Sequence, residues 1–241
     1  MEKKLRRIRP KIYVLGAILF MLAVLYILFT YIEIFDTKIH FTLDTAKYIS
    51  IVLCLLISLF IGEDHITKKG RCSLQFALFF TTVADFFLLI YPKHVLGIGI
   101  FCIAHIFHAI RFEGRKAHVI IGRHTMSLFI LIVMHFIVGL YIIDIEFIYI
   151  ISLFYAMLLI SNVKRAVGIY KTKVLPLANS YMVAIGMVLF LLCDINVALY
   201  NTIGSNRIPF LLIWFFYLPS QVVLALSGWD YNKLLAKGGS L

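Results

Sequence analysis

The sequence predicts an all-α polytopic membrane protein with about eight transmembrane helices. Apolar residues make up 62% of the 241 residues, whereas a soluble globular chain usually has about 45–50% on a similar count. These residues come in runs of about 20, the length that a helix needs to cross a bilayer. No internal repeat and no linker long enough to separate domains is visible, so residues 1–241 are expected to form a single membrane-embedded helical domain.

The order of apolar runs and basic residues also predicts a topology. The expected spans cover residues 12–32, 45–62, 72–91, 95–112, 125–142, 145–163, 175–199 and 209–228. Nineteen of the 23 Lys and Arg residues lie in the two tails and in every second connection, and only Lys38, Lys47, Lys93 and Arg207 lie in the alternate segments. Because Lys and Arg concentrate in cytoplasmic segments, both termini are expected to be cytoplasmic. The basic start is interpreted as the flank of a first helix rather than of a cleaved signal, since the run after it is long enough to span.

These orientation signals account for the net charge of +11, so no nucleic-acid partner is expected. The expected surroundings are the lipid bilayer of the cytoplasmic membrane, or of the endoplasmic reticulum if the source is eukaryotic. The four cysteines form no CxxC pair, and three lie well inside apolar runs. They indicate small buried side chains rather than disulfides or a thiolate metal site.

Two of the 12 carboxylates, Asp85 and Asp194, lie within predicted spans. Placing an aspartate at the membrane centre costs roughly 2.5–3.5 kcal/mol, so such residues are usually functional. Each precedes an outer tyrosine, Tyr91 or Tyr200, by six residues. At about 1.5 Å per residue both lie about 9 Å below that tyrosine, so the two aspartates can share one site.

Other polar side chains fall near the same depth, on shared helix faces. They are His105 and His108 at i, i+3, Tyr217 and Gln221 at i, i+4, and Lys47 at the outer start of the second span. Each also fits a structural role in packing or, for Lys47, in reaching the interface. His135 is interpreted as a hydrogen-bonded core histidine, and the stripe of Ser152, Tyr155 and Asn162 as a helix-packing face.

Three segments around these residues resemble the YhhN family of integral-membrane lysoplasmalogenases. Residues 84–89 (ADFFLL) followed by 97–112 (GIGIFCIAHIFHAIRF) are similar to the family's GD-x-x-L and G-x-x-x-F-x-x-(A/S)-H-x-x-Y. Residues 186–194 (GMVLFLLCD) are similar to G-A-x-L-F-x-x-S-D, and residues 217–221 (YLPSQ) to Y-x-x-x-Q. The chain departs from the pattern at Ala84 for glycine, His108 for tyrosine and Cys193 for serine, and Tyr48 stands where proline is common after Lys47.

The resemblance implies an enzyme, a hydrolase of ether bonds. Its substrate would be a lysoplasmalogen, a lysophospholipid whose vinyl ether is cleaved to a fatty aldehyde and a glycerophospho-ethanolamine or -choline. Asp85 and Asp194 would supply acid–base catalysis, and His105, His108, Tyr217, Gln221 and Lys47 would position substrate or water. The resemblance implies no metal and no organic cofactor.

Two other classes of function remain open at this stage. A zinc-dependent intramembrane lipid hydrolase would use His105, His108 and His135 with the aspartates as ligands. A non-enzymatic membrane transporter ranks lower, because the sequence has no inverted repeat and no pair of Gly/Pro-broken spans.

Overall fold

The computed structural model describes residues 2–35, 40–62, 64–113, 116–141, 146–172, 174–203 and 207–231. These residues form helices and no strand. In chain order the helices are α1 (Glu2–Phe35), α2 (His40–Leu59), α3 (Lys68–Asp85), the π-helical turn η1 (Phe86–Ile90), α4 (His94–Glu113), α5 (Ala117–Tyr141), α6 (Phe147–Thr172), α7 (Leu177–Thr202) and α8 (Arg207–Leu226).

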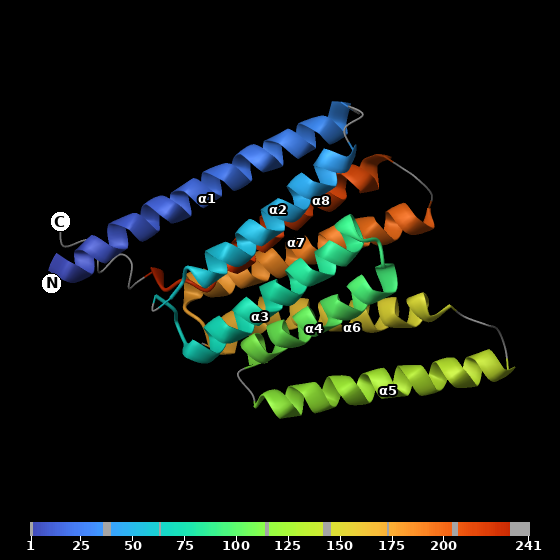
Figure 1. Cartoon of the computed structure of the whole chain (residues 1–241). Helices are drawn as coiled ribbons and strands as arrows, with labels where there is room; N and C mark the ends of the chain where they lie inside the picture. Colours follow the sequence, from blue (N-terminus) through green and yellow to red (C-terminus); the bar gives the residue numbers. More distant parts are fainter. Residues whose placement is uncertain are drawn as a thin grey trace.

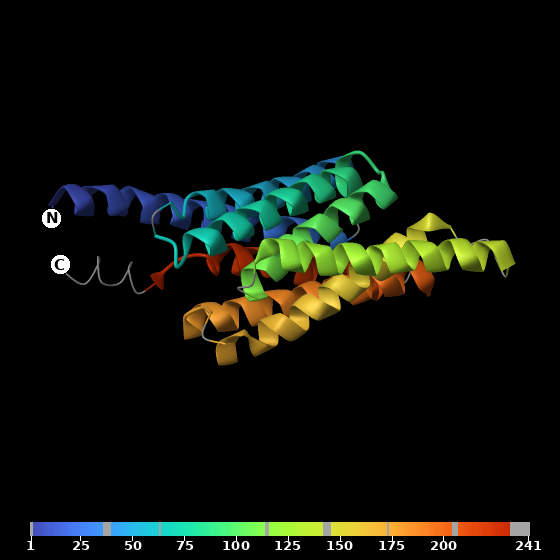
Figure 2. The same ribbon diagram turned by 90° about the horizontal axis from the view of Figure 1, so that it is seen from below.

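The helices pack side by side along a common direction (Figure 1). Seen from below, α1 to α4 form one layer, α6 and α7 form another, and α8 lies between them (Figure 2). The most extensive contacts join α7 to α8 and α3 to α4, while α6 packs against both α4 and α7. Helix α5 packs against α4 and α6 at the edge of the bundle.

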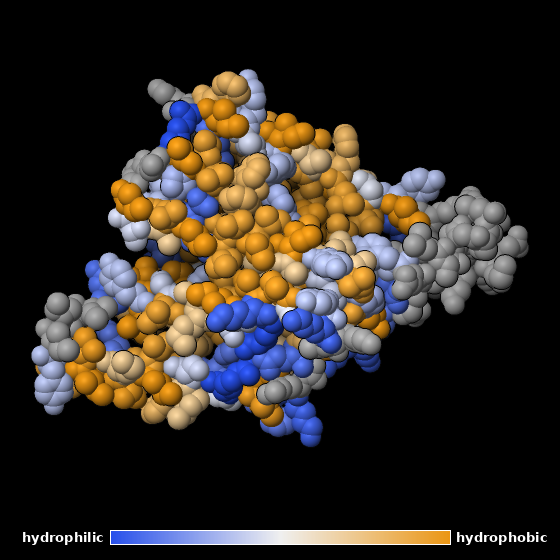
Figure 3. Space-filling view, turned by 180° about the vertical axis from the view of Figure 1, so that it is seen from behind, coloured by the Kyte–Doolittle hydropathy of each residue, from blue (hydrophilic) through white to orange (hydrophobic). Residues whose placement is uncertain are grey.

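The surface of the bundle is that of a protein surrounded by lipid. Seven of the described helices are long and apolar enough to cross a membrane, and the remaining one, α2, has 20 residues and packs among α1, α3 and α8. Large apolar side chains face outward, among them Phe20 at 73% exposure and Leu140 at 77%. Apolar residues cover much of one face in Figure 3. The chain is therefore an integral membrane protein with the all-α polytopic fold that the sequence predicts.

The start of α1, the α2–α3 connection and the end of α8 meet at one end of the bundle. Lys11 Nζ lies 3.2 Å from Asp64 Oδ2, and the Asp230 amide donates to the Asp64 carbonyl at 2.8 Å. His65 and Trp229 form an isolated antiparallel bridge beside these contacts. The chain therefore makes an even number of passes between these points, and the cytoplasmic location of this end stays a prediction from the basic residues.

Most helices extend beyond the predicted spans, and the extensions of α5 and α6 bring basic residues together. Helix α5 begins at Ala117 rather than at 125, and α6 continues to Thr172 rather than ending at 163. The extra turns carry Arg123 and Arg165, which both pair with Glu113 at the end of α4, each at 2.5 Å. In contrast, α2 ends at Leu59 rather than at 62, because the chain turns at Gly62 with a φ of 53°. Lys38, Glu63 and residues 142–145, where the fifth predicted span gives way to the sixth, lie outside the described residues.

Candidate active site

Asp85 lies where α3 changes from α-helical to π-helical geometry. It is the last residue of α3, and in the following turn η1 the Tyr91 amide donates to the Phe86 carbonyl five residues earlier, at 2.9 Å. Turns of this kind are rare and are frequent at functional sites, because they change the direction in which neighbouring side chains point. The Asp85 side chain is buried, with 4% exposure.

The hydroxyl of Tyr217, on α8, holds the Asp85 carboxyl. Tyr217 Oη donates to Asp85 Oδ2 at 2.6 Å, and both residues are buried. The Tyr217 ring is held by edge-on contacts with Trp214 and Phe190, whose ring centroids lie 5.2 and 5.5 Å away. The structure thus brings together two of the predicted site residues that lie 132 positions apart in the chain.

Asp194, on α7, has the same kind of partner from a different helix. Tyr155 Oη, on α6, donates to Asp194 Oδ2 at 2.5 Å. Sequence reasoning placed Tyr155 in a helix-packing stripe, and it does pack, with its ring 5.1 Å from that of His105. A tyrosine in the middle of an apolar span was the available signal, because a buried hydroxyl needs a partner at that depth.

His105 and Phe190 connect the two aspartate–tyrosine pairs. The His105 ring lies 5.1 Å from the rings of both Tyr155 and Phe190, and Phe190 in turn contacts Tyr217. These ring contacts link Tyr217, the partner of Asp85, to Tyr155, the partner of Asp194. Four helices, α3, α6, α7 and α8, therefore contribute to one cluster, and α4 supplies the histidine next to it.

Two glycines allow these helices to approach closely. A Cβ at Gly97 on α4 would lie 2.6 Å from Leu88 Cδ2 and 3.3 Å from the Ala84 carbonyl oxygen. A Cβ at Gly186 on α7 would lie 2.7 Å from Leu224 Cγ, and the Gly186 carbonyl accepts a hydrogen bond of 2.8 Å from Ser220. The α3–α4 and α7–α8 pairs thus have the close contacts typical of helices in membranes, which fix the positions of Asp85 and Asp194.

Lys47 is buried and paired away from the aspartates. Its ammonium lies 2.6 Å from Glu33 on α1, and both side chains are at most 4% exposed. It also lies 5.1 Å above the ring of Trp214, the residue that packs on Tyr217. In the sequence, Glu33 directly follows the first predicted span. Its pairing with Lys47 depends on how α1 packs against α2, which no local pattern reveals.

His108 and Gln221 are completely buried. Both ring nitrogens of His108, both polar atoms of the Gln221 amide, Nε2 of His105 and Oγ1 of Thr81 have no hydrogen-bond partner among the described residues. Buried polar groups are normally paired, and an unpaired one costs about 1–3 kcal/mol. Polar atoms of this kind are the ones that a bound polar molecule would satisfy.

His135 lies apart from this cluster. It is on α5, with its ring 6.4 Å from that of Phe147, and α5 packs against α4 and α6 at the edge of the bundle. In the part of the chain that the structure describes, no three His, Cys, Asp or Glu side chains come together as ligands of a metal ion would. This arrangement gives no support to the zinc-dependent alternative, whose ligand set included His135.

The fold and the cluster define a polytopic helical membrane protein with two aspartates on its inner helix faces, Asp85 buried and Asp194 partly buried. The chain belongs to the YhhN family, whose model matches residues 43–228. The matched region contains both aspartates and their tyrosines, and it leaves out α1 with Glu33. No curated protein and no solved structure matches the chain.

Proposed function

We propose that this membrane protein is a lysoplasmalogenase-like hydrolase that cleaves the vinyl ether of lysoplasmalogens. The products would be a fatty aldehyde and a glycerophospho-ethanolamine or -choline. The observation that carries the proposal is the cluster in which Asp85 and Asp194 are each held by a tyrosine from another helix, with the rings of His105 and Phe190 between the two pairs. Membership of the YhhN family is compatible with this activity.

The reaction needs one acid and one base next to a water molecule. A carboxylic acid gives its proton to the β carbon of the vinyl ether, which leaves an oxocarbenium ion at the carbon bonded to oxygen. Water adds to that carbon while a carboxylate accepts the proton that the water loses, and the hemiacetal then separates into aldehyde and alcohol. One water is consumed and the catalytic proton is returned, the division of roles that two carboxyls also have in glycosidases.

Asp85 and Asp194 fit these roles as a pair. Each tyrosine donates to one carboxyl oxygen, Oδ2 in both cases, and so holds its carboxyl in a fixed orientation. Buried carboxyls that interact can share a single proton, and the charged member would stabilise the oxocarbenium ion. The roles of acid and base belong to the pair rather than to either residue.

The remaining polar residues would hold the substrate. Gln221 and His108 present unpaired polar atoms in the interior and would contact the glycerol hydroxyl or the water. Lys47 is a buried cation above the ring of Trp214, and Trp214 contacts Tyr217. Lys47 is therefore the candidate for contact with the lipid phosphate. In this proposal the substrate enters from the bilayer, since its chain stays among the apolar surfaces of the helices.

The test is aldehyde release by the purified protein in detergent, with no metal added. Asp85→Asn and Asp194→Asn should each reduce the rate by about 10²–10⁴-fold, because an amide keeps the shape of the side chain but can neither deliver a proton nor carry the charge. His135→Gln and Glu146→Gln are controls on α5 and at the exposed start of α6, and both should retain activity. The ester-linked lysophospholipid should be a poor substrate, since it has no vinyl ether to protonate.

Two results would contradict the proposal. Normal turnover by both Asn variants would remove the aspartates from the mechanism. Complete loss of activity on adding EDTA, with recovery on adding zinc, would support the zinc-dependent lipid hydrolase instead.

A further inference from the structure

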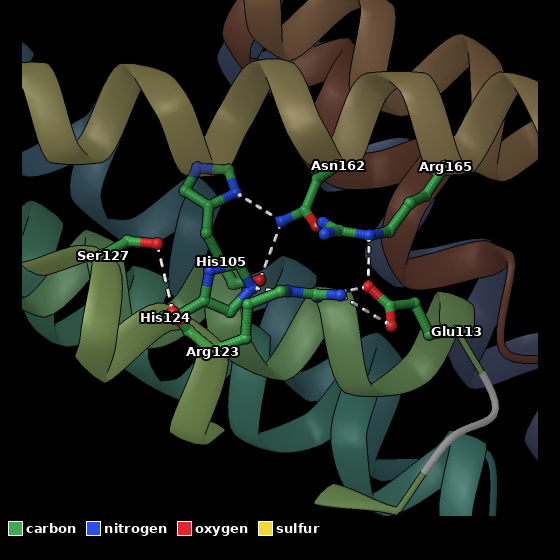
Figure 4. Close-up of polar contacts among 7 residues, drawn as sticks. All are labelled: His105, Glu113, Arg123, His124, Ser127, Asn162 and Arg165. Carbon is green, nitrogen blue, oxygen red and sulfur yellow. Dashed lines mark hydrogen bonds and ion pairs between the residues drawn. The ribbon is translucent and has the colours of Figure 1, made fainter. Parts of the chain in front are cut away.

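A chain of polar contacts leads from the end of α4 to the buried ring of His105 (Figure 4). Glu113 pairs with Nε of Arg165 on α6 at 2.5 Å. Arg165 Nη1 donates to Asn162 Oδ1 at 2.9 Å. Asn162 Nδ2 then donates to the His105 carbonyl oxygen at 2.7 Å and lies 3.3 Å from His105 Nδ1.

The partners of Asn162 fix the orientation of its amide. A guanidinium group can only donate hydrogen bonds, so the Asn162 atom that faces Arg165 must be the carbonyl oxygen. A backbone carbonyl can only accept, so the atom that faces the His105 carbonyl must be the NH₂ nitrogen. Both contacts require the same orientation, and neither argument depends on telling oxygen from nitrogen by shape.

This orientation in turn fixes the proton of His105. The NH₂ group of Asn162 has two hydrogens, one for the His105 carbonyl and one for Nδ1. Nδ1 must therefore accept, and a neutral imidazole with an accepting Nδ1 carries its proton on Nε2. The imidazolium form would set the N–H of Nδ1 against the N–H of the amide, so the contact also excludes the charged ring.

The protonated Nε2 belongs to the candidate active site. His105 is 0% exposed, and its Nε2 has no hydrogen-bond partner among the described residues. The same ring contacts Tyr155, whose hydroxyl is bonded to Asp194, and Phe190, which contacts Tyr217. A donor is thus available next to the pair of Tyr155 and Asp194, with Phe190 between it and Tyr217.

We propose that Asn162 is a positioning residue that holds His105 as an Nε2–H donor for an oxygen of the bound lysolipid. The lysolipid part of this inference rests on the proposed function. In this tautomer Nε2 has no lone pair for a proton or a metal ion, so His105 is neither a general base nor a zinc ligand. Arg165 and Glu113 act one step further away, by holding the Asn162 amide in its orientation.

The first experiment reads the tautomer directly and needs no activity. The full-length protein, labelled with ¹⁵N at histidine and held in detergent, is examined by NMR, with His105→Gln used to assign the His105 signals. We expect Nδ1 without a proton and Nε2 with one. A protonated Nδ1, in either the neutral or the charged ring, would overturn the proposal.

The second experiment replaces the hydrogen-bond donor of Asn162 by an acceptor. Asn162→Asp keeps the size and the contact with Arg165 but replaces the donor facing Nδ1 by an acceptor. We expect the His105 proton to move to Nδ1 and aldehyde release to fall about 10²-fold, the usual effect of losing one preorganised donor. If folded Asn162→Asp kept the wild-type tautomer of His105, the positioning role of Asn162 would be wrong. If this variant does not fold, the wild-type spectrum still shows which nitrogen of His105 carries the proton.

Asn179→Leu is the matched control. Asn179 is equally buried, at 1% exposure, and its Nδ2 donates to two backbone carbonyls, those of Ser227 and Trp229, at 3.0 and 2.7 Å. Its loss should lower thermal stability and leave the His105 tautomer and the rate per folded molecule unchanged.

The two experiments also separate this inference from the proposed function. A wild type with the Nε2–H tautomer but with no aldehyde release would contradict the proposed function and the donor role, while the tautomer assignment would hold.

Discussion

At the scale of single residues, the two aspartates have matching partners. Each accepts one hydrogen bond at Oδ2 from a tyrosine on a neighbouring helix, Tyr217 for Asp85 and Tyr155 for Asp194. A hydroxyl donor at one carboxyl oxygen holds the carboxyl in place. The tyrosines therefore determine where a proton is delivered or accepted, even though they need not exchange one themselves.

Removing either hydroxyl should slow the reaction without unfolding the protein. In Tyr217→Phe and Tyr155→Phe the ring contacts remain, but the carboxyl loses a hydrogen bond, which for a charged group is worth about 1.5–3 kcal/mol. We expect aldehyde release per folded molecule to fall by about 10- to 100-fold in each variant, and the melting temperature to fall by several degrees while the fold is kept. Tyr149→Phe is the control, because Tyr149 is 65% exposed on α6. Full activity in both variants would show that the bonds are only structural.

The aspartates could be predicted from the sequence because a carboxylate inside an apolar run is costly wherever the helix packs. Their partners could not be predicted in the same way. Tyr155 and Asn162 have ordinary side chains on a helix face that packs against α4 and α7. Which atom each one contacts depends on the rotation of α6 relative to its neighbours, and this is a property of the folded bundle.

At the scale of the elements, α4, α5 and α6 are joined at one end by a single carboxylate. Glu113 pairs with Arg123 on α5 and with Arg165 on α6. Basic residues in the last turns of long helices reach the interface by extending their side chains, so the helices can continue past the point where the apolar run ends. The predicted spans leave Arg123 and Arg165 in connections, because they follow the apolar runs alone.

The close contact between α3 and α4 predicts opposite effects of one substitution at two nearby glycines. In Gly97→Ala the new methyl group would meet Leu88 and the Ala84 carbonyl, so we expect a loss of about 1–3 kcal/mol from overpacking. In Gly99→Ala nothing lies within 4 Å of the new atom, so the greater helix propensity of alanine should stabilise by up to about 1 kcal/mol. Thermal unfolding of both variants in the same detergent measures the difference.

The prediction for the two glycines is tested by whether each variant is more or less thermally stable than the wild type. Gly97→Ala should also reduce aldehyde release per folded molecule, because Ala84 is next to Asp85 and the two helices must separate to fit the methyl group. If Gly97→Ala were as stable as Gly99→Ala, the α3–α4 contact would be looser than the structure has it. The position of Asp85 would then need a different explanation.

At the scale of the whole molecule, ion pairs join α1 to the rest of the bundle towards both of its ends. The buried pair of Lys47 and Glu33 joins α1 to α2 near one end, and Lys11 meets Asp64 at the other. A buried ion pair gives little net stability but penalises the loss of either partner. The pair of Lys47 and Glu33 therefore favours one position of α1 against α2. Helix α1 lies outside the family match, which begins at residue 43.

The last prediction concerns the orientation of the bundle in the membrane. The contacts of Asp64 with Lys11 and Asp230 put the start of α1, the α2–α3 connection and the end of α8 on one side. Most basic residues of the chain are expected on that side, so it should be cytoplasmic. Reporter fusions after Lys69 and at the C-terminus should report the cytoplasm, and fusions after Lys38, Lys93 and Arg207 should report the opposite side. An inside signal at Lys93 would contradict the assignment of α3 and α4 as separate spans, and disagreement between the Lys69 and C-terminal fusions would contradict the even number of passes between them.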